Sequence, residues 1–228
     1  MDKIDALCDS SSLISLTGSC LDNVLYYLNQ RFHLRFIIPP SVEGETVTRP
    51  LSSGLKNYSF SAIKIKRAIK DNVIVKVDVN NVQKEASNIL SITNNLFFIK
   101  SKPLYLVQIG EAEMLALAKF LGVETIIIDE RTTRMLIEAP FKLKEHLEQE
   151  FGVNIMVNRD NLLKFSDFTK GFQTIRSSEL FILAYENGYL DAYDDIKKEA
   201  LEAALYKIKF SGCSISFDEI RDYLATIK

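Results

Sequence analysis

The sequence is poor in the residues that mark several large classes of protein. Its 228 residues include nine glycines, five prolines and no tryptophan, which argues against a fibrous chain or a flexible linker. Hydrophobic residues make up 47% of the chain, too many for a disordered protein. No stretch of 18 apolar residues predicts a membrane span. Because residues 1–5 lack the profile of a signal peptide, we expect a cytoplasmic protein.

Cysteine and histidine are also scarce. The three cysteines, at positions 8, 20 and 213, are odd in number and widely spaced. This pattern fits a reduced cytosol and excludes both a disulfide framework and a CxxC metal site. With only His33 and His146 present, zinc chemistry and a histidine-based triad are disfavoured. A chain of this length buries a full hydrophobic core, as one large domain or one and a half small ones.

The net charge of −2 hides an uneven distribution of charged residues. Residues 51–104 contain nine basic and three acidic side chains, a charge of +6, whereas the remainder contains 19 basic and 27 acidic ones, a charge of −8. A basic stripe on an acidic body indicates a phosphate-binding protein. A solvated helix face that is basic by chance is an alternative of equal weight.

The first 50 residues predict alternating strands and helices. Apolar runs at 4–8 and 34–38 predict buried strands, and a turn of serines is expected at 10–12. An apolar stripe over 21–28 predicts one helix, and the proline pair before 41–48 predicts another. This alternation is typical of a parallel sheet with helices on its faces.

The alternation resumes near residue 110 after a segment of less regular pattern. In that segment, 62–70 and 82–92 are expected to be helices and 73–79 a strand or the end of a helix. Beyond residue 158 the chain is expected to be mostly helical. The elements predicted from residue 110 onward are helices over 111–121, 131–137, 141–151, 177–187, 196–210 and 217–227, and strands over 125–128 and 153–157.

Four acids lie near the carboxyl ends of the predicted strands. Asp9 and Asp129 directly follow strands, Glu45 lies in the helix after the second strand, and Glu111 opens the helix that precedes the strand at 125–128. Ligands of open α/β sheets bind at that edge. Carboxylates that share a cleft repel one another unless a cation neutralises them, and oxygen ligands without His or Cys favour Mg²⁺ or Mn²⁺. Such ions activate a water and stabilise the leaving oxygen of a phosphodiester. For each acid alone, a helix cap or turn residue is the alternative.

Four segments, in order, resemble the motifs of the PIN-domain ribonucleases. Residues 7–14 (LCDSSSLI) resemble the opening motif, and 40–45 (PSVEGE) resemble the second. Residues 110–118 (GEAEMLALA) resemble the third motif of the branch with Gly-Glu-x-Glu, and 126–134 (IIIDERTTR) resemble the fourth. Residues 210–216 are similar to the short C-terminal unit that this branch often carries.

The resemblance implies an α/β fold, a Rossmann-like PIN domain with a central parallel sheet flanked by helices, over residues 1–158. It also implies metal-dependent hydrolysis of RNA, with Mg²⁺ or Mn²⁺ as cofactor. The residues implied to bind metal and act in catalysis are Asp9, Glu45, Glu111 and Asp129. Ser11 would hydrogen-bond a ligand carboxylate.

Glu113 and Glu130 compete with two members of this set. Glu113 lies two residues from Glu111, about 200° around a helix, so only one of them can face the cleft. We expect that residue to be Glu111, because Ala118 then falls seven residues on, on the same face. Glu130 is also interpreted as a helix-start acid favoured by the helix dipole.

The chain is longer than the family pattern, because a helical basic insertion at 51–104 and a mostly helical extension at 159–228 are added to it. The residues expected to contact RNA are Arg131, Arg134, Lys64, Lys66, Arg67 and Lys70. For the arginine pair, solvated helix residues are an equal alternative.

The leading hypothesis is a cytoplasmic endoribonuclease, with the toxin of a toxin–antitoxin pair as one form of it. Its partners would be RNA, an antitoxin or other protein, and a second copy of the chain, but no membrane. The alternatives are a catalytically weak or inactive PIN-fold RNA-binding or regulatory protein, and a protein-interaction module.

Overall fold

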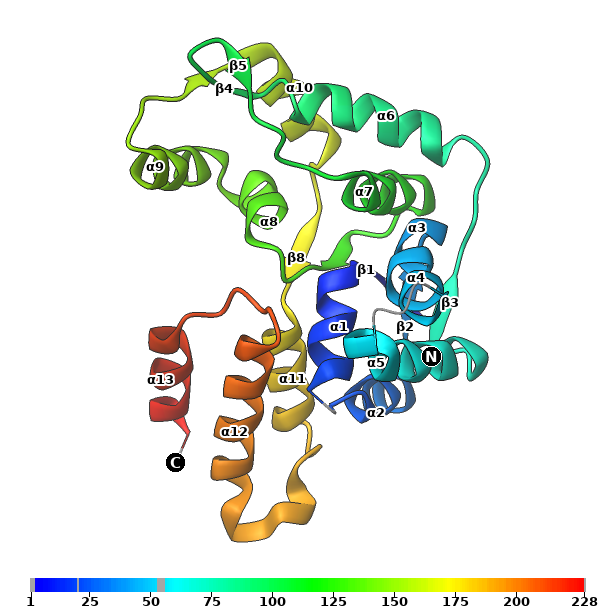
Figure 1. The fold of residues 1–228 in the computed structure, drawn as a ribbon. Helices are drawn as coiled ribbons and strands as arrows, with labels where there is room; N and C mark the ends of the chain where they lie inside the picture. Colours follow the sequence, from blue (N-terminus) through cyan, green and yellow to red (C-terminus); the bar gives the residue numbers. More distant parts are fainter. Residues whose placement is uncertain (1–2, 20, 53–55, 228) are drawn as a thin grey trace.

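The computed structural model describes residues 3–19, 21–52 and 56–227, which form an α/β fold around a parallel sheet (Figure 1). Within these residues the sheet has five strands in the order β3-β2-β1-β6-β8, and every neighbouring pair is parallel. The strands are β1 (Ile4–Cys8), β2 (Leu34–Ile38), β3 (Ile74–Lys76), β6 (Thr125–Ile127) and β8 (Gln173–Ile175). The fold class predicted from the alternation is thereby confirmed at the level of a parallel α/β sheet flanked by helices.

A second, antiparallel sheet has the order β5-β4-β7. Its strands are β4 (Phe97–Ile99), β5 (Lys102–Pro103) and β7 (Met156–Val157).

The helices are α1 (Ser10–Gly18), α2 (Asn23–Phe32), α3 (Pro40–Glu43), the π-helix η1 (Gly44–Thr48), α4 (Arg49–Ser52), α5 (Lys56–Lys70), α6 (Val82–Thr93), α7 (Ile109–Leu121), α8 (Arg131–Glu138), α9 (Pro140–Phe151), α10 (Arg159–Phe168), α11 (Ser177–Glu186), the 3₁₀-helix η2 (Asp191–Ile196), α12 (Lys197–Phe210) and α13 (Phe217–Thr226).

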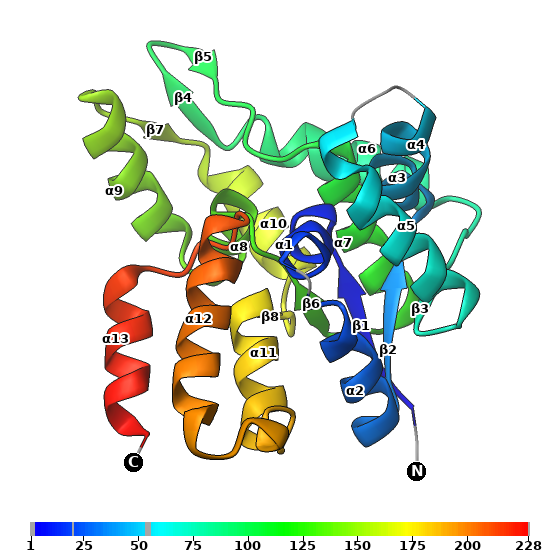
Figure 2. The same cartoon turned by 60° about the horizontal axis from the view of Figure 1, so that its bottom comes forward.

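The central sheet is covered on both faces by helices. Ala6 and Cys8 of β1 face a core that includes side chains of α1, α2, α5, α11, α12 and α13. Leu7, between them, faces the opposite core, built with α6, α7, α8, α9 and α10. Figure 2 shows α11, α12 and α13 side by side on the first face. Burial on both faces explains why the strands are continuous apolar runs in the sequence.

The start of the chain follows the prediction except at its serines. The predicted strands 4–8 and 34–38 have the bounds of β1 and β2. The serines at 10–12 do not form a turn but begin α1, because the Asp9 side chain accepts a hydrogen bond from the N–H of Ser12 and caps the helix.

Two further predictions are corrected in the structure. The single helix expected over 41–48 is α3 followed by the π-helix η1, in which one extra residue fits into a turn. Of the strand expected over 153–157, only β7 forms, and it pairs antiparallel with β4 in the small sheet. β8 was not expected, since three residues with mixed polarity give no apolar run.

The two segments that were expected to be additions to the PIN-like domain, residues 51–104 and 159–228, contribute to its hydrophobic core and central sheet. From residues 51–104 come α5 and β3, and Ile65 and Ile74 are fully buried in the core beneath α1 and α2. From beyond residue 158 comes β8, the edge strand of the central sheet beside β6. None of the described helices combines the length and apolar character that crossing a membrane requires.

A buried arginine holds the last helix against the rest of the fold. Arg176 precedes α11, and its Nη2 lies 2.7 Å from Oε1 of Glu179 and 2.8 Å from Oε1 of Glu219, in the first turn of α13. Burial by itself would raise the pKa of Glu219, but the hydrogen bonds from Arg176 and from the N–H of Ser216 hold it at about 2. The ion pair therefore stabilises the docked position of α13.

Replacement of Glu219 by Gln tests this tether. Glutamine keeps the capping box with Ser216 but removes the charge, so we expect Tm at pH 7 to fall by roughly 2–4 °C. Because the pKa of Glu219 is lowered from 4.5, its contribution is present above pH 4.5 and is lost as pH falls towards 2. The difference in Tm between the two proteins should therefore shrink in acid.

Glu202→Gln, a substitution at an exposed position of α12, is the control and should melt like wild type. Equal Tm values of Glu219→Gln and wild type at pH 7 would contradict the role assigned to Glu219.

Candidate functional site

Asp9 lies at the carboxyl end of β1, where the strand gives way to α1. Its carboxylate accepts hydrogen bonds from the N–H of Ser12 at 2.8 Å and from the hydroxyl of Ser11 at 2.7 and 2.9 Å. The side chain is buried. The sequence places a capping residue directly after a buried strand, so Asp9 is held at the edge where parallel α/β sheets bind ligands. The hydrogen bond from Ser11 to Asp9 is of the kind that the resemblance implied, from Ser11 to a carboxylate of the site.

Glu45 reaches the same region from the π-helix η1. Its Oε2 accepts a hydrogen bond of 2.6 Å from the hydroxyl of Ser10. Gly110 lies so close that an added Cβ would be 3.2 Å from Oε1 of Glu45. A larger residue at position 110 would therefore crowd this carboxylate, which explains the glycine at the start of α7.

Glu111 enters from the first turn of α7. Its Oε2 accepts a hydrogen bond of 2.5 Å from the N–H of Gln108, within a capping box. Glu113, two residues further along the helix, is not among the residues that line the cavity described below. Of the two candidates, the structure brings Glu111 together with Asp9 and Glu45.

Asp129 and Glu130 follow β6 and point to different neighbours. Asp129 is buried, and its two oxygens accept hydrogen bonds from the N–H and the hydroxyl of Ser177 at 2.7 and 2.6 Å. Glu130 caps α8 through the N–H groups of Thr132 and Thr133. Glu130 lines the cavity described below, whereas Asp129 does not. The negative charge of Asp129 nevertheless raises the pKa of Asp9.

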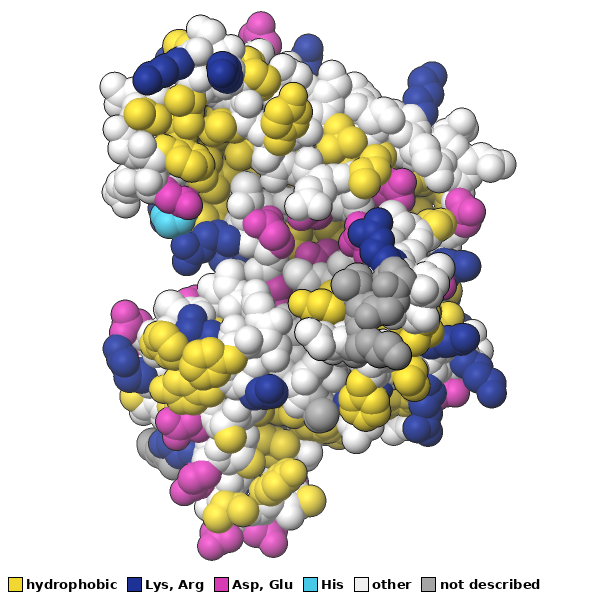
Figure 3. Space-filling model, in the orientation of Figure 1, with side chains coloured by type: hydrophobic (Ala, Val, Ile, Leu, Met, Phe, Trp, Pro, Cys, Tyr) yellow, Lys and Arg dark blue, Asp and Glu magenta, His cyan; other side chains and the backbone are white. Residues whose placement is uncertain are grey.

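These side chains enclose a small cavity of about 110 Å³. Figure 3 shows acidic side chains gathered near the middle of the corresponding face. Its lining residues are Asp9, Ser10, Ser11, Val42, Glu45, Gln108, Gly110, Glu111 and Glu130. We call this space the acidic cavity.

The pKa of Asp9 is raised from 3.8 to about 7. Burial is the main cause, and the negative charge of Asp129 adds to it, while the hydrogen bonds from Ser12 and Ser11 act in the opposite direction. Asp9 therefore resists ionisation at neutral pH unless positive charge is brought to it.

The pKa of Glu111 is raised from 4.5 to about 7. Burial again contributes most, and the charges of Glu130, Asp9 and Glu45 add to it against the hydrogen bond from Gln108. Among the described residues, none of the salt bridges neutralises a carboxylate of the acidic cavity. Like charges are thus concentrated in a partly buried space, and the salt bridges of the described residues do not offset them.

The donor set of the acidic cavity fits Mg²⁺ or Mn²⁺ in chemical type. It offers carboxylate and hydroxyl oxygens and neither imidazole nor thiolate. In the part of the chain that the structure describes, no three His, Cys, Asp or Glu residues converge closely enough to share a metal ion. Each carboxylate is instead bonded to a nearby helix start or serine and keeps lone pairs for a further partner.

The predicted basic residues separate into two groups. Lys64 is only 15% exposed, with its Nζ 2.7 Å from Oδ1 of Asp22, so its charge is already matched. Lys66, Arg67 and Lys70 are exposed and line a groove of about 810 Å³ between α5 and the segment of η1 and α4. The other lining residues are Glu43, Val47, Thr48, Leu51, Ser52, Ile63 and Ile69. We call this space the basic groove.

The two arginines of α8 have partners of their own. Nη1 of Arg131 lies 3.2 Å from Nε2 of His146, and Nη1 of Arg134 lies 3.0 Å from Oε2 of Glu138. Arg131 is exposed, whereas Arg134 is half-buried. Arg131 directly follows Glu130, which lines the acidic cavity, and Arg134 lies three residues further along α8.

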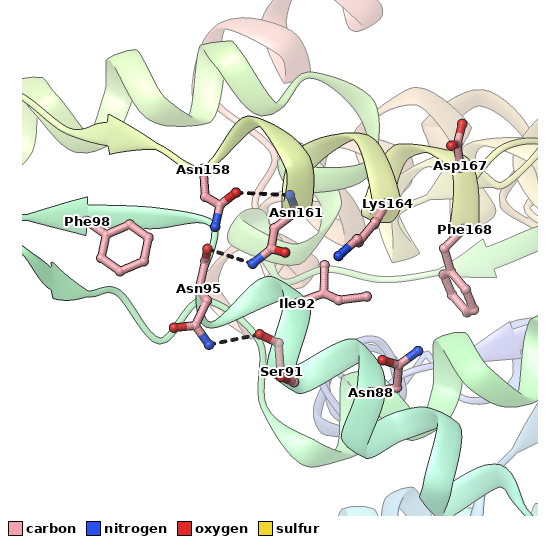
Figure 4. Close-up of a pocket in the computed structure, with 10 residues that line it drawn as sticks. All are labelled: Asn88, Ser91, Ile92, Asn95, Phe98, Asn158, Asn161, Lys164, Asp167 and Phe168. Carbon is pink, nitrogen blue, oxygen red and sulfur yellow. Dashed lines mark hydrogen bonds between the residues drawn. The ribbon is translucent and has the colours of Figure 1, made fainter.

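A third hollow, which the sequence did not suggest, lies between α6 and α10 (Figure 4). It measures about 760 Å³ and is rich in amides, with Nδ2 of Asn161 donating to the backbone oxygen of Asn95. Lys164 and Asp167 are its only charged lining residues among those described. Its residues come from two segments far apart in the sequence, 88–98 and 158–168, so no local pattern reveals it. Asp167 is the one carboxylate among its described lining residues, so it lacks the group of carboxylates that makes the acidic cavity a candidate for cation binding.

Comparison with known proteins adds no relative. No protein-family model, no curated protein and no solved structure matches the chain. The site is therefore interpreted from its own geometry and charge.

Replacement of Glu111 by Gln tests the electrostatics of the acidic cavity. Since the pKa of Glu111 is raised from 4.5 to about 7, the folded state keeps a proton that the unfolded state releases between these values. In metal-free protein its contribution to the free energy of unfolding therefore falls as pH rises from 4.5 to 7. We expect Glu111→Gln to flatten this dependence and to be more stable than wild type at pH 8 by about 1–3 kcal/mol.

Glu113→Gln is the matched control, with the same substitution on the same helix but outside the acidic cavity. Urea unfolding with EDTA at pH 4 and pH 8 measures the effect. If Glu111→Gln and Glu113→Gln change stability equally at both pH values, the raised pKa is assigned to the wrong residue.

Proposed function

We propose that this chain is a cytoplasmic, metal-dependent endoribonuclease that uses Mg²⁺ or Mn²⁺ to hydrolyse RNA phosphodiester bonds. The observation that carries the proposal is the acidic cavity, whose lining includes Asp9, Glu45, Glu111 and Glu130 at the carboxyl edge of a parallel sheet. The order of the PIN-like motifs along the sequence supports the same reaction.

The chain's own residues prepare the reaction by positioning negative charge. Asp9, Glu45, Glu111 and Glu130 would hold the cation, and Asp129 would strengthen its binding from behind Asp9. When bound, the ion activates water for attack and stabilises negative charge that develops on the phosphodiester. Binding of a cation would return Asp9 and Glu111 to their ionised forms, because positive charge lowers the pKa of a nearby carboxyl.

The serines fix where these carboxylates point. Hydroxyls of Ser10 and Ser11 donate to Glu45 and Asp9, and Ser177 donates twice to Asp129. Each serine leaves at least one lone pair of its carboxylate free towards a ligand.

The basic groove supplies a path for the RNA backbone. It lies on η1, the same helix that carries Glu45, so phosphates bound by Lys66, Arg67 and Lys70 would pass close to the acidic cavity. Arg131 is the residue next to Glu130 in the chain and is exposed, so it would offer a further phosphate contact. Phosphate contacts of this kind position a nucleic acid without reading its sequence.

A second candidate function is an inactive regulatory or protein-interaction module. The carboxylates of the acidic cavity already serve as helix caps or serine partners, which is a sufficient structural role. The basic groove also has an apolar floor that includes Val47, Leu51 and Ile63, which suits an acidic amphipathic segment, such as that of an antitoxin or a second protomer. Metal binding separates this function from the first.

Addition of Mn²⁺ tests the metal site. At a concentration 100-fold above Kd we expect Tm to rise by about 5–10 °C, because a ligand that binds only the folded state stabilises it. Asp9→Asn keeps a good helix cap but removes the charge, and should abolish both the Tm shift and RNA cleavage. Differential scanning calorimetry and gel analysis of a labelled RNA give the two readouts.

Glu113→Gln is again the control and should respond to Mn²⁺ like wild type. Cleavage that persists in Asp9→Asn would disprove the nuclease assignment. Absence of both the Tm shift and cleavage in wild type would support the inactive module instead.

Neutralisation of the basic groove tests the RNA path. The triple variant Lys66→Gln, Arg67→Gln, Lys70→Gln should weaken binding of single-stranded RNA and reduce the slope of log K against log salt by about 2, at roughly 0.7 per phosphate contact. Lys64→Gln is the internal control, because Lys64 is paired with Asp22, and its salt slope should equal that of wild type. An unchanged slope in the triple variant would exclude the basic groove as the RNA path.

A further inference from the structure

Three aromatic rings form an exposed cluster at the adjoining ends of α12 and α13. Phe210 is 72% exposed and Phe217 is 43% exposed. The rings of Tyr206 and Phe210 are stacked, with centroids 6.5 Å apart and an interplanar angle of 23°, and Phe217 lies 6.0 Å from each. We call Tyr206, Phe210 and Phe217 the aromatic patch. Apolar surface of this kind is costly in water unless a partner covers it.

The aromatic patch is tied to the elements that carry the acids. Ser211 directly follows Phe210. Its hydroxyl accepts a hydrogen bond of 2.8 Å from the hydroxyl of Ser19, at the end of α1. Cys213 contacts Ser178, the neighbour of the serine that binds Asp129, with its Sγ 3.4 Å from Oγ. Figure 3 shows a hydrophobic patch over the ends of α12 and α13 on the face where the acidic side chains gather.

Positive charge accompanies the rings. Nζ of Lys209 lies 4.4 Å from the centroid of the Phe217 ring and donates to the backbone oxygen of Ile215. Lys207, two residues before it, is exposed. Flat rings beside lysines are the combination with which proteins bind single-stranded nucleic acid, since bases stack on the rings and phosphates meet the charges.

The size of the aromatic patch argues against a second protomer as its occupant. A stable interface buries about 800 Å² on each partner, whereas one aromatic side chain buries about 150–250 Å² when fully covered. Two of these three rings are already partly covered by the fold. The remaining area is sufficient for one or two bases and too small for a dimer.

The dimensions of the acidic cavity point to the same occupant. A volume of about 110 Å³ accommodates an ion and a few waters, at roughly 30 Å³ for each water, but no nucleobase. Bases that flank a phosphodiester at the acidic cavity must therefore lie on the surrounding face, where the aromatic patch is found.

We infer that the aromatic patch stacks unpaired bases of a single-stranded RNA whose backbone reaches the acidic cavity. This inference rests on the proposed nuclease function and adds to it a base-stacking surface outside the acidic cavity. Bases in a duplex are already stacked on each other and leave the rings uncovered.

The test uses the full chain with EDTA and a 12-nucleotide RNA that carries one 2-aminopurine, whose fluorescence falls when it stacks. Binding of this RNA to wild type should quench the probe. The double variant Phe210→Ala, Phe217→Ala should bind about tenfold or more weakly, since each base–ring stack contributes about 1–3 kcal/mol, and should lose the quenching. Phe151→Ala, which removes a 50% exposed phenylalanine from α9, is the matched control and should behave as wild type. A duplex of the same sequence should bind both proteins equally.

Two further measurements keep the outcomes separate. If the double variant does not fold, Phe210→Leu keeps the apolar volume without the ring and should still reduce quenching. Wild-type affinity and quenching in a folded variant would overturn the inference while metal-dependent cleavage by wild type continued to support the proposed function. A wild-type dimer that becomes monomeric in the variant, with RNA binding unchanged, would also overturn it and identify the aromatic patch as a protomer contact. Absence of both RNA binding and cleavage in wild type would overturn the two proposals together.

Discussion

The structure depends on the burial of several carboxylates at one edge of its parallel sheet. Four of them lie at the start of a helix or hydrogen-bond to it: Asp9 caps α1, Glu111 lies in the first turn of α7, Glu130 caps α8, and Asp129 bonds the first residue of α11. Unpaired N–H groups at helix starts stabilise negative charge. The same acids that repel one another thus determine where four helices begin, and the fold cannot lose them without loosening its helix ends.

The two roles of these acids are in partial conflict. As caps they favour ionised side chains, but as buried neighbours two of them have a pKa raised to about 7. A protein that needed only caps would gain by placing them apart, because burial and repulsion oppose what each cap contributes. Their gathering around a small cavity is the reason to read them as a binding site, with the basic groove and the aromatic patch providing contacts too large for the cavity itself.

How much the sequence reveals varies with the range of the interactions. β1 and β2 are predictable because strands buried on both faces are continuous apolar runs. β8 is not, since three residues at the sheet edge are placed by pairing with β6. Asp129 was expected in the cavity, but the cavity is lined by Glu130, because the turn after β6 directs successive side chains to different partners. Local patterns predict which acids lie near the sheet edge, whereas the positions of their side chains depend on contacts between residues more than 30 positions apart.

The π-helix that carries Glu45 makes chain length as important as residue type. A π turn contains one residue more than an α turn, and each residue of a regular helix advances about 100° around its axis. Loss of one residue of η1 other than Glu45 would let the segment relax into an ordinary α-helix and rotate Glu45 away from Ser10 and Gly110. Every acid would still be present in the sequence. A homologue with such a deletion would align with this chain at all of its acidic positions and yet have a differently built site.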